Sequence, residues 1–124
     1  MDPEHPLAAL MKRRKTPHMW EGYGLATRCV HAGQAPDLVN GGVNTALCLS
    51  STYAQESPGV TYNGYEYTRT NNPTRQACED VIASLEGGKF GLCYASGCAA
   101  TAACMSLLSP GDHVISTDDV YGGT

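Results

Sequence analysis

The stretch of sequence that decides the fold is residues 71–98, which read NNPTRQACEDVIASLEGGKFGLCYASGC. Asn72 is suited to cap a helix, and Pro73 suits the first helical position, where its missing N–H group costs nothing. Apolar residues then recur at helical spacing until the pair Gly87-Gly88 interrupts them, and these residues are Ala77, Val81, Ile82 and Leu85. The sequence therefore predicts a helix that begins at Pro73 and ends before Gly87.

The residues that follow this helix predict a strand, a second helix and a second strand. Phe90–Ala95 is a short apolar run of the kind found in strands that are buried on both faces. Ser96 and Gly97 form a turn, and Cys98–Leu108 is so uniformly small and apolar that it predicts a helix buried nearly all round. After another turn, His113–Thr117 has the pattern of a short strand. This alternation of helices and strands predicts an α/β fold.

The N-terminal part of the chain carries weaker patterns. The first twenty residues are expected to form an arm, and no helical or strand periodicity persists from Glu21 to Val60. Lys12–Lys15 is the single basic cluster, which we interpret as a solvated patch rather than a localisation signal. Asp2 and Glu4 stand where a signal peptide would carry positive charge, so no such peptide is predicted.

Composition excludes several classes of protein. The chain has 124 residues, with 8 Lys+Arg against 12 Asp+Glu and a net charge of -4. This balance lacks the basic footprint that nucleic-acid binding requires, so no nucleic-acid partner is expected. No apolar run approaches the roughly 20 residues that cross a bilayer, so no membrane partner is expected either.

The six cysteines indicate a reducing compartment. Cys93, Cys98 and Cys104 lie in apolar stretches, where a cysteine behaves as a small hydrophobic residue. Their spacings are not those of a zinc site, and no metal is predicted. We therefore expect buried, reduced thiols and a cytoplasmic protein.

Two segments have residues that suit an anion. In residues 95–101 a strand end meets a helix start, where unpaired N–H groups and the helix dipole attract negative charge. Gly97 lets an anion approach the backbone and Ser96 adds a hydroxyl, although many such turns bind nothing. In residues 65–69, Tyr67 and Arg69 would point to one side of an extended segment, and a phenol beside a guanidinium suits a phosphate. The alternative for this arginine is a surface ion pair, with Glu66 or Glu79 as its partner.

Tyr121 is a third candidate, flanked by Gly122 in a loop just past a predicted strand. An aromatic ring on such a loop can stack on a planar heterocycle, and the alternative is a half-buried structural tyrosine. Two further candidates are discounted. His113 has no evident catalytic partner, and the adjacent side chains of Asp118-Asp119 are expected to point apart.

Five blocks of sequence follow one another along the chain. They are Leu25–Arg28 with His31–Gly33, Leu49–Thr52, Tyr65–Arg75, Tyr94–Gly97 and Asp118–Thr124. In this order they resemble the Cys/Met-metabolism family of pyridoxal-phosphate enzymes, which includes cystathionine γ-lyase, cystathionine γ-synthase, cystathionine β-lyase and methionine γ-lyase. The resemblance runs from about Gly24 to Thr124 and rests on the five blocks together.

The resemblance implies an incomplete α/β chain of fold-type I, the aspartate-aminotransferase-like class. Residues 1–64 would be an N-terminal arm that contacts the neighbouring subunit, and residues 65–124 would be the start of the large domain that binds pyridoxal 5'-phosphate. In that fold the first two strands are not neighbours, so Phe90–Ala95 would lack a partner for its backbone groups. We therefore expect that the chain by itself neither folds stably nor turns over substrate.

The resemblance also implies roles for the candidate residues. Tyr67 and Arg69 would reach the cofactor phosphate of a neighbouring subunit in a homotetramer. Ser96, Gly97 and Cys98 would bind the phosphate of their own subunit; relatives often carry Leu or Met in place of this cysteine, but a backbone contact does not depend on the side chain. Tyr121 would stack on the pyridine ring and assist proton transfer.

The implied parent is a carbon–sulfur lyase of trans-sulfuration that splits cystathionine into cysteine, 2-oxobutanoate and ammonia. Gly122 stands close to where methionine γ-lyases tend to carry a cysteine, while the γ-synthase and β-lyase activities remain alternatives. None of Lys12, Lys15 and Lys89 matches the family's Schiff-base lysine, which lies further along the chain. Two other hypotheses are a non-catalytic product that binds a full-length partner and a thiol redox or metal protein.

Overall fold

The computed structural model describes residues 22–37 and 39–124. The chain divides into two compact units, Met1–Gly91 and Leu92–Thr124. We call these the first unit and the second unit and describe each by itself. The first twenty residues, with the basic cluster Lys12–Lys15, lie outside the described residues, whereas most of the rest of the expected arm, residues 1–64, is described.

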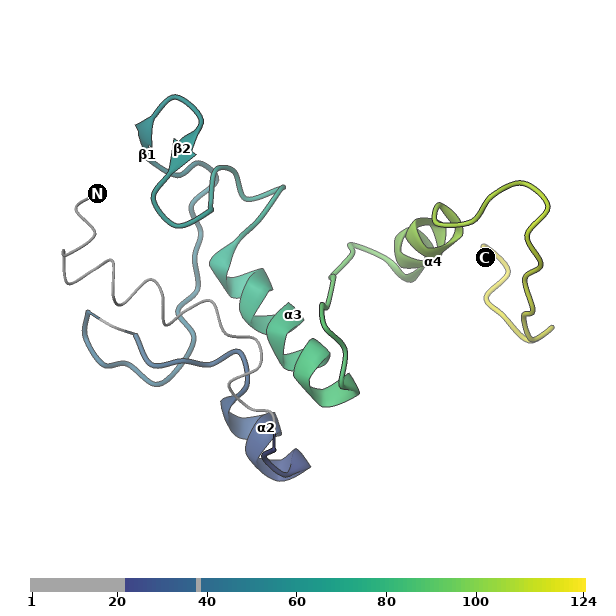
Figure 1. Ribbon diagram of the computed structural model, residues 1–124, viewed down its shortest axis with the longest axis horizontal. Coiled ribbons are helices and arrows are strands. Elements are labelled where there is room, and N and C mark those ends of the chain that lie inside the picture. Colours follow the sequence, from purple (N-terminus) through teal and green to yellow (C-terminus); the bar gives the residue numbers. More distant parts are fainter. Residues whose placement is uncertain (1–21, 38) are drawn as a thin grey trace. The chain divides into compact units, whose positions relative to one another are not determined.

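Helix α3 (Pro73–Glu86) is the main element of the first unit (Figure 1). The side-chain oxygen of Asn72 caps it, accepting hydrogen bonds from the backbone N–H groups of Thr74 at 2.8 Å and Arg75 at 3.3 Å. The helix ends at Gly87, whose φ of 65° is the left-handed conformation that glycine adopts without strain. The predicted helix and both of its end signals are confirmed.

Helix α2 (Leu25–His31) packs against α3, and no periodicity in the sequence predicted it. The Arg28 guanidinium donates a hydrogen bond to the carbonyl of Ser84 near the end of α3. Gly33, just past α2, has a φ of +68° and lies so close to the Ala77 carbonyl that a Cβ at this position would overlap it. A glycine permits this approach, and Ala32 and Ala83 are the buried apolar residues of the described chain.

A short hairpin precedes α3. Strands β1 (Gln55–Ser57) and β2 (Val60–Thr61) pair antiparallel, and the Gln55 side chain accepts a hydrogen bond from the Gly59 N–H group in the turn. A separate bridge pairs Thr52 with Tyr67. This bridge holds residues 51–53 beside residues 66–68, which brings a segment distant in sequence to the residues that lead into α3.

The second unit contains helix α4 (Gly97–Met105), capped by the Ser96 hydroxyl, which accepts from the Ala99 N–H group at 3.1 Å. The predicted helix is therefore present, but it ends three residues before Leu108. Its predicted burial is wrong, because no residue of α4 is buried. An apolar helix is buried only when other elements cover it, and within the second unit α4 is the only helix or strand among the described residues.

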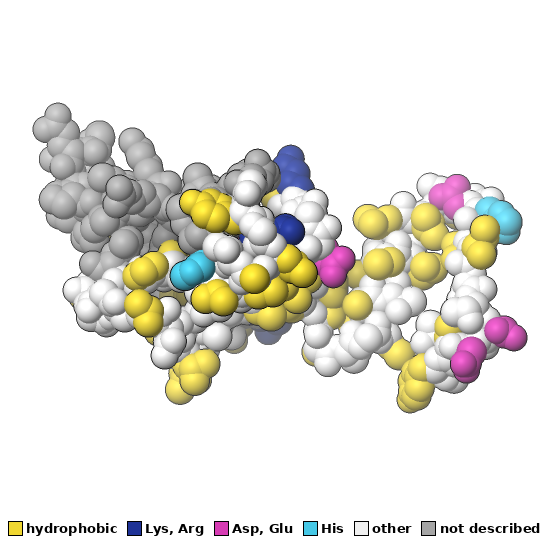
Figure 2. Space-filling model, turned by 90° about the horizontal axis from the view of Figure 1, so that it is seen from below, with side chains coloured by type: hydrophobic (Ala, Val, Ile, Leu, Met, Phe, Trp, Pro, Cys, Tyr) yellow, Lys and Arg dark blue, Asp and Glu magenta, His cyan; other side chains and the backbone are white. Residues whose placement is uncertain are grey.

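The two predicted strands, Phe90–Ala95 and His113–Thr117, do not form in the described part of the chain. A strand requires a partner for its backbone N–H and C=O groups, and neither segment has one. Their side chains are exposed, with Leu92 at 72% and Ile115 at 89%. Figure 2 accordingly shows many hydrophobic side chains on the face that it presents.

The cysteine prediction is half right. All six cysteines lie in the described ranges and none is in a disulfide, as expected for reduced thiols. Their predicted burial is wrong, because Cys93, Cys98 and Cys104 are exposed and Cys48 is only half-buried. The reason is the same as for α4, since the apolar stretches that carry the first three are not covered. Within residues 22–37 and 39–124, no helix is long and apolar enough to span a membrane.

Candidate anion-binding site

Tyr67 and Arg69 lie together in the first unit. The guanidinium carbon of Arg69 is 5.0 Å from the centroid of the Tyr67 ring, which is a cation–π contact. The predicted proximity is thus present, but its cause differs from the expected strand alternation. The chain turns after Tyr67, whose carbonyl accepts hydrogen bonds from the N–H groups of Thr70 and Asn71, both at 3.0 Å. We call residues 67–70 the Tyr67 turn.

The charge of Arg69 is not matched by a carboxylate in the described part of the chain. Glu79, one of the two predicted ion-pair partners, instead pairs with Arg75, with 3.5 Å between Nε and a carboxylate oxygen. Besides this ring contact, the Arg69 guanidinium, which carries five N–H donors, makes no hydrogen bond with any described residue. Its guanidinium therefore keeps donors for an anion, and the Tyr67 ring, 39% exposed, lies beside it.

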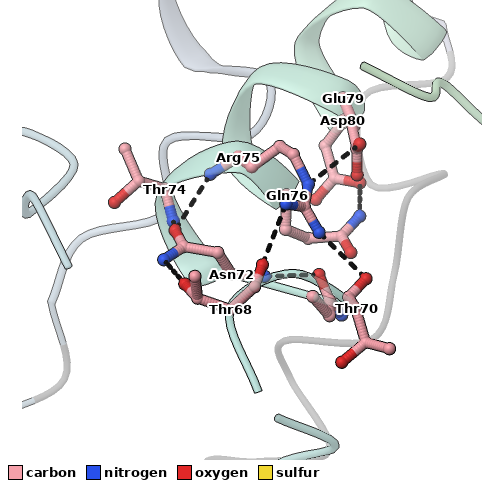
Figure 3. Close-up of polar contacts among 9 residues, drawn as sticks. Thr68, Thr70, Asn72, Thr74, Arg75, Gln76, Glu79 and Asp80 are labelled. Carbon is pink, nitrogen blue, oxygen red and sulfur yellow. Dashed lines mark hydrogen bonds and ion pairs between the residues drawn. The ribbon is translucent and has the colours of Figure 1, made fainter. Parts of the chain in front are cut away.

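Side chains of α3 fix the Tyr67 turn (Figure 3). Arg75 donates two hydrogen bonds of 2.9 Å, one to the Thr68 carbonyl and one to the Thr70 carbonyl. The Asn72 amide donates to the Thr68 hydroxyl at 2.6 Å. Sequence reasoning missed Arg75. The available signal was its place in the first turn of a helix, where a cation is unfavourable unless another contact compensates.

A further segment is attached to the same helix start. The Cys48 N–H group donates to the Thr74 hydroxyl at 2.8 Å, and that hydroxyl donates to the Ala46 carbonyl at 3.0 Å. The Cys48 thiol lies 3.2 Å from the Tyr53 hydroxyl. This hydrogen bond, with some desolvation, raises the pKa of Tyr53 above its ordinary value. The start of α3 thus organises residues 46–53 as well as the Tyr67 turn.

The start of α4 presents open backbone donors in the second unit. Ser96 satisfies the N–H group of Ala99 with its side chain and that of Ala100 with its carbonyl, at 3.1 Å each. The N–H groups of Gly97 and Cys98 make no hydrogen bond with any described residue, and both residues are exposed. A Cβ at Gly97 would meet nothing within 4 Å. These two amides at the positive end of a nine-residue helix suit an anion.

The loop that carries Tyr121 meets this helix start. The Cys98 thiol contacts the Gly123 carbonyl at 3.9 Å, and the Thr124 N–H group donates to the Tyr121 carbonyl at 2.8 Å. The Tyr121 side chain is 77% exposed. The structure thus gathers the predicted residues of the second unit, Ser96, Gly97, Cys98 and the Tyr121 loop, in one place.

No group of three or more His, Cys, Asp or Glu side chains that might share a metal ion occurs among residues 22–37 and 39–124. The ammonium of Lys89 lies 5.3 Å from the Phe90 ring centroid. His113 and Asp118-Asp119 lie in exposed chain without a helix or strand.

Comparison with known proteins identifies the family to which the chain belongs. Residues 26–124 match the family described as Cys/Met metabolism PLP-dependent enzymes. The chain belongs to this family, as the resemblance of its sequence blocks predicted, and the cofactor of the family is pyridoxal 5'-phosphate.

Individual relatives carry three different activities. The chain is 57% identical over 98 residues to a cystathionine β-lyase of Coxiella burnetii, covering 79% of this chain and 25% of that protein. It is 52% identical over 102 residues to a probable cystathionine γ-synthase of Herpetosiphon aurantiacus, covering 82% and 32% respectively. Among solved structures, the cystathionine γ-lyase from yeast is similar with a TM-score of 0.73 and 42% identity, over 83% of this chain and 26% of that one.

The chain thus spans about a quarter to a third of the length of the relatives it matches. The predicted fold class, an incomplete α/β chain of a fold-type I enzyme, is confirmed. The residues present also fit the phosphate of the family's cofactor: Arg69 has donors without a carboxylate partner, and α4 begins with two open amides.

Proposed function

We propose that the chain is the phosphate-binding part of a carbon–sulfur lyase of trans-sulfuration, which cleaves cystathionine to cysteine, 2-oxobutanoate and ammonia. One observation carries the proposal: the chain has two sets of hydrogen-bond donors that are available to an anion. They are the Arg69 guanidinium against the Tyr67 ring and the open amides of Gly97 and Cys98. Membership of a pyridoxal-phosphate family supplies the anion that both sets would bind.

The two sets of donors do different work. The planar guanidinium of Arg69 can hold two phosphate oxygens at once, and the Tyr67 hydroxyl can donate a third hydrogen bond. The α4 amides hold another oxygen and contribute the helix dipole, and Ser96 can donate its hydroxyl proton while its oxygen caps the helix. Together these contacts would neutralise a dianion and fix the cofactor at its phosphate end.

Tyr121 is proposed as the catalytic residue of the chain. Its exposed ring, on the loop against the start of α4, is available to stack on a pyridine ring whose phosphate lies at the helix. Pyridoxal phosphate, when bound, supplies an electron sink for carbanions that form beside the substrate's amino group. The Tyr121 phenol, as its phenolate, would take the proton from that amino group, or it would relay a proton by accepting one at its oxygen while giving up its own.

The remaining proposals concern assembly. Residues 1–64 would be an arm that contacts the neighbouring subunit, and residues 65–124 would begin the cofactor-binding domain. Tyr67 and Arg69 would serve the active site of that neighbour within a cytoplasmic homotetramer. Without the family's lysine, the 124-residue chain by itself is expected to be inactive.

Two activities of the same family are the main alternatives. The β-lyase of Coxiella burnetii and the probable γ-synthase of Herpetosiphon aurantiacus both exceed half identity to this chain, so each activity has support. A non-catalytic role, in which the chain binds a full-length partner through Tyr67 and Arg69, is the alternative from another class. Co-purification of the chain with a longer subunit would favour it.

The experiment that tests the proposal is product analysis with the intact gene product. With cystathionine as substrate, γ-cleavage releases cysteine and 2-oxobutanoate, whereas β-cleavage releases homocysteine and pyruvate. A synthase instead consumes cysteine together with an activated homoserine ester. We expect 2-oxobutanoate and cysteine in equal amounts. Pyruvate with homocysteine would replace the proposed activity by that of a β-lyase. If neither 2-oxobutanoate nor pyruvate is formed, both lyase activities are contradicted.

A further inference from the structure

We propose that Arg75 is a positioning residue, which holds the backbone of Arg69 in the conformation that presents its guanidinium to a phosphate. This inference rests on the proposed phosphate role of Arg69. Arg75 is distinct from the residues expected to contact the cofactor, and it acts through the Tyr67 turn.

The geometry of the contact is specific to Arg69. The two hydrogen bonds of the Arg75 guanidinium end on the Thr68 and Thr70 carbonyls, which belong to the residues immediately before and after Arg69. Arg69 itself makes no backbone hydrogen bond with any residue that the structure describes. The backbone orientation at Arg69 therefore depends on its two neighbours, and Arg75 holds both of them (Figure 3).

The charges of the two arginines are arranged differently. Arg75 lies in the first turn of α3, where the helix dipole disfavours a cation. The Glu79 carboxylate, whose side chain is 9% exposed, lies 3.5 Å from its Nε atom and compensates. Arg69 has no such carboxylate within the described ranges. An incoming dianion therefore finds one arginine already neutralised and the other one available.

The shape of the guanidinium also matters. Two different nitrogens of the rigid, planar Arg75 guanidinium bind the carbonyls of Thr68 and Thr70, each at 2.9 Å. A lysine at position 75 keeps the positive charge and can still pair with Glu79, but its single ammonium lacks this fork. An Arg75→Lys variant therefore separates the charge of Arg75 from its two-carbonyl geometry.

The Tyr67 turn has enough other hydrogen bonds to persist without Arg75. Thr68 keeps its N–H bond to the Ser51 carbonyl and its hydroxyl bond to Asn72. Thr70 keeps its N–H and hydroxyl bonds to the Tyr67 carbonyl. Loss of Arg75 should thus loosen the residues on either side of Arg69 without unfolding the segment.

The test compares two probes, pyridoxal 5'-phosphate and pyridoxal, in binding to the apo form of the intact protein. Only the first probe carries the phosphate, so a change in the ratio of their dissociation constants reports on phosphate contacts alone. The variants are Arg69→Ala, Arg75→Ala, Arg75→Lys and Gln76→Ala. Gln76 is the matched control, because its side chain bonds Asp80 on α3 and does not touch the Tyr67 turn.

Arg69→Ala should weaken pyridoxal 5'-phosphate binding by about 100-fold and leave pyridoxal binding unchanged. Arg75→Ala should show the same selectivity with a loss of about tenfold. Arg75→Lys should recover only part of this loss, and Gln76→Ala should lose nothing. If Arg75→Ala does not fold, Arg75→Lys tests the positioning role through the same ratio of the two dissociation constants.

The failures are distinguishable. If Arg69→Ala is selective for the phosphate but Arg75→Ala and Arg75→Lys weaken both probes equally, or neither, the positioning role is overturned and the phosphate role stands. If Arg69→Ala itself does not change the ratio, the phosphate role of Arg69 fails, and the inference fails with it.

Discussion

The two units orient their hydrogen-bond donors for an anion by different physical means. In the first unit the donor is a flexible side chain, and a set of side-chain hydrogen bonds from Arg75 and Asn72 fixes the turn that carries it. In the second unit the donors are backbone amides of Gly97 and Cys98, which the helix itself aims, with one capping bond from Ser96. To orient a side chain therefore takes a supporting network of hydrogen bonds, whereas to orient a helix amide takes only a capped helix.

Individual glycines of the two units differ in how closely other backbone groups approach them. Gly33 and Gly91 both lie against carbonyl groups of α3, those of Ala77 and Glu79, where an added Cβ would overlap. Gly97 and Gly122 in the second unit have nothing within 4 Å of that position. Substitutions at Gly33 and Gly122 therefore compare a packed glycine of the first unit with an open glycine of the second.

The largest effect is expected from Gly33→Ala. The alanine would have to adopt a φ of +68° and displace the Ala77 carbonyl, which should lower the unfolding free energy by about 2–5 kcal/mol. Gly122→Ala, with open space and no positive φ, should stay within about 0.5 kcal/mol of the wild type. Denaturant unfolding of the intact protein measures both, and equal losses would show that the contrast in packing is wrong.

A smaller effect separates the two helix caps. Asn72→Ala removes the cap of α3 together with bonds to the Thr68 hydroxyl and the Cys48 carbonyl, which should cost roughly 2–3 kcal/mol. Ser96→Ala removes one capping bond and should cost roughly 1 kcal/mol.

Native-state hydrogen exchange in the intact protein checks this prediction, because it reports on α3 and α4 separately. The protection of α3 amides should fall more in Asn72→Ala than the protection of α4 amides falls in Ser96→Ala. A larger loss at α4 would contradict the idea that the first unit depends more on side-chain bonds.

The smallest effect concerns pH. The Cys48 hydrogen bond raises the pKa of Tyr53, so the fold favours the neutral phenol. The resulting stability is fully present below the ordinary tyrosine pKa and is lost as the pH rises through the raised value. In an alkaline titration followed by phenolate absorbance, Tyr53→Phe should remove the absorbance change of one tyrosine, and it should do so at the high-pH end of the titration curve. Tyr62→Phe, at an exposed tyrosine, is the matched control, and an equal change in both would contradict the assignment.

Local sequence signals predicted the features that depend on neighbouring residues. The Asn72 cap, the first-turn Pro73 and the terminal Gly87 place α3 correctly, because each acts within a few residues of the helix end. The same holds for the Ser96 cap of α4. Features that depend on distant partners were missed or wrong: Phe90–Ala95 forms no strand because no described segment pairs with it.

The candidate site shows the same division. Its residues were found from short motifs, and the Tyr67–Arg69 contact follows from a spacing of two residues. The two hydrogen bonds from Arg75 to the Tyr67 turn were not predicted, because their prediction requires knowing that the chain turns back onto the first turn of α3. Helix α2 was missed because it has seven residues, a glycine at its N-cap and exposed apolar side chains.

Subunit complementation tests most directly whether two subunits each contribute half of one site, one half being Tyr67 with Arg69 and the other α4 with Tyr121. Intact Arg69→Ala and Tyr121→Ala proteins are each assayed at a pyridoxal 5'-phosphate concentration too low to fill the Arg69→Ala site, and are then mixed, dissociated and reassembled. The account predicts recovery of about a quarter of wild-type cystathionine cleavage, since half of the subunit pairs are mixed and each mixed pair has one intact site. No recovery, with mixed assemblies demonstrated, would contradict it, because both residues would then serve the same subunit's site.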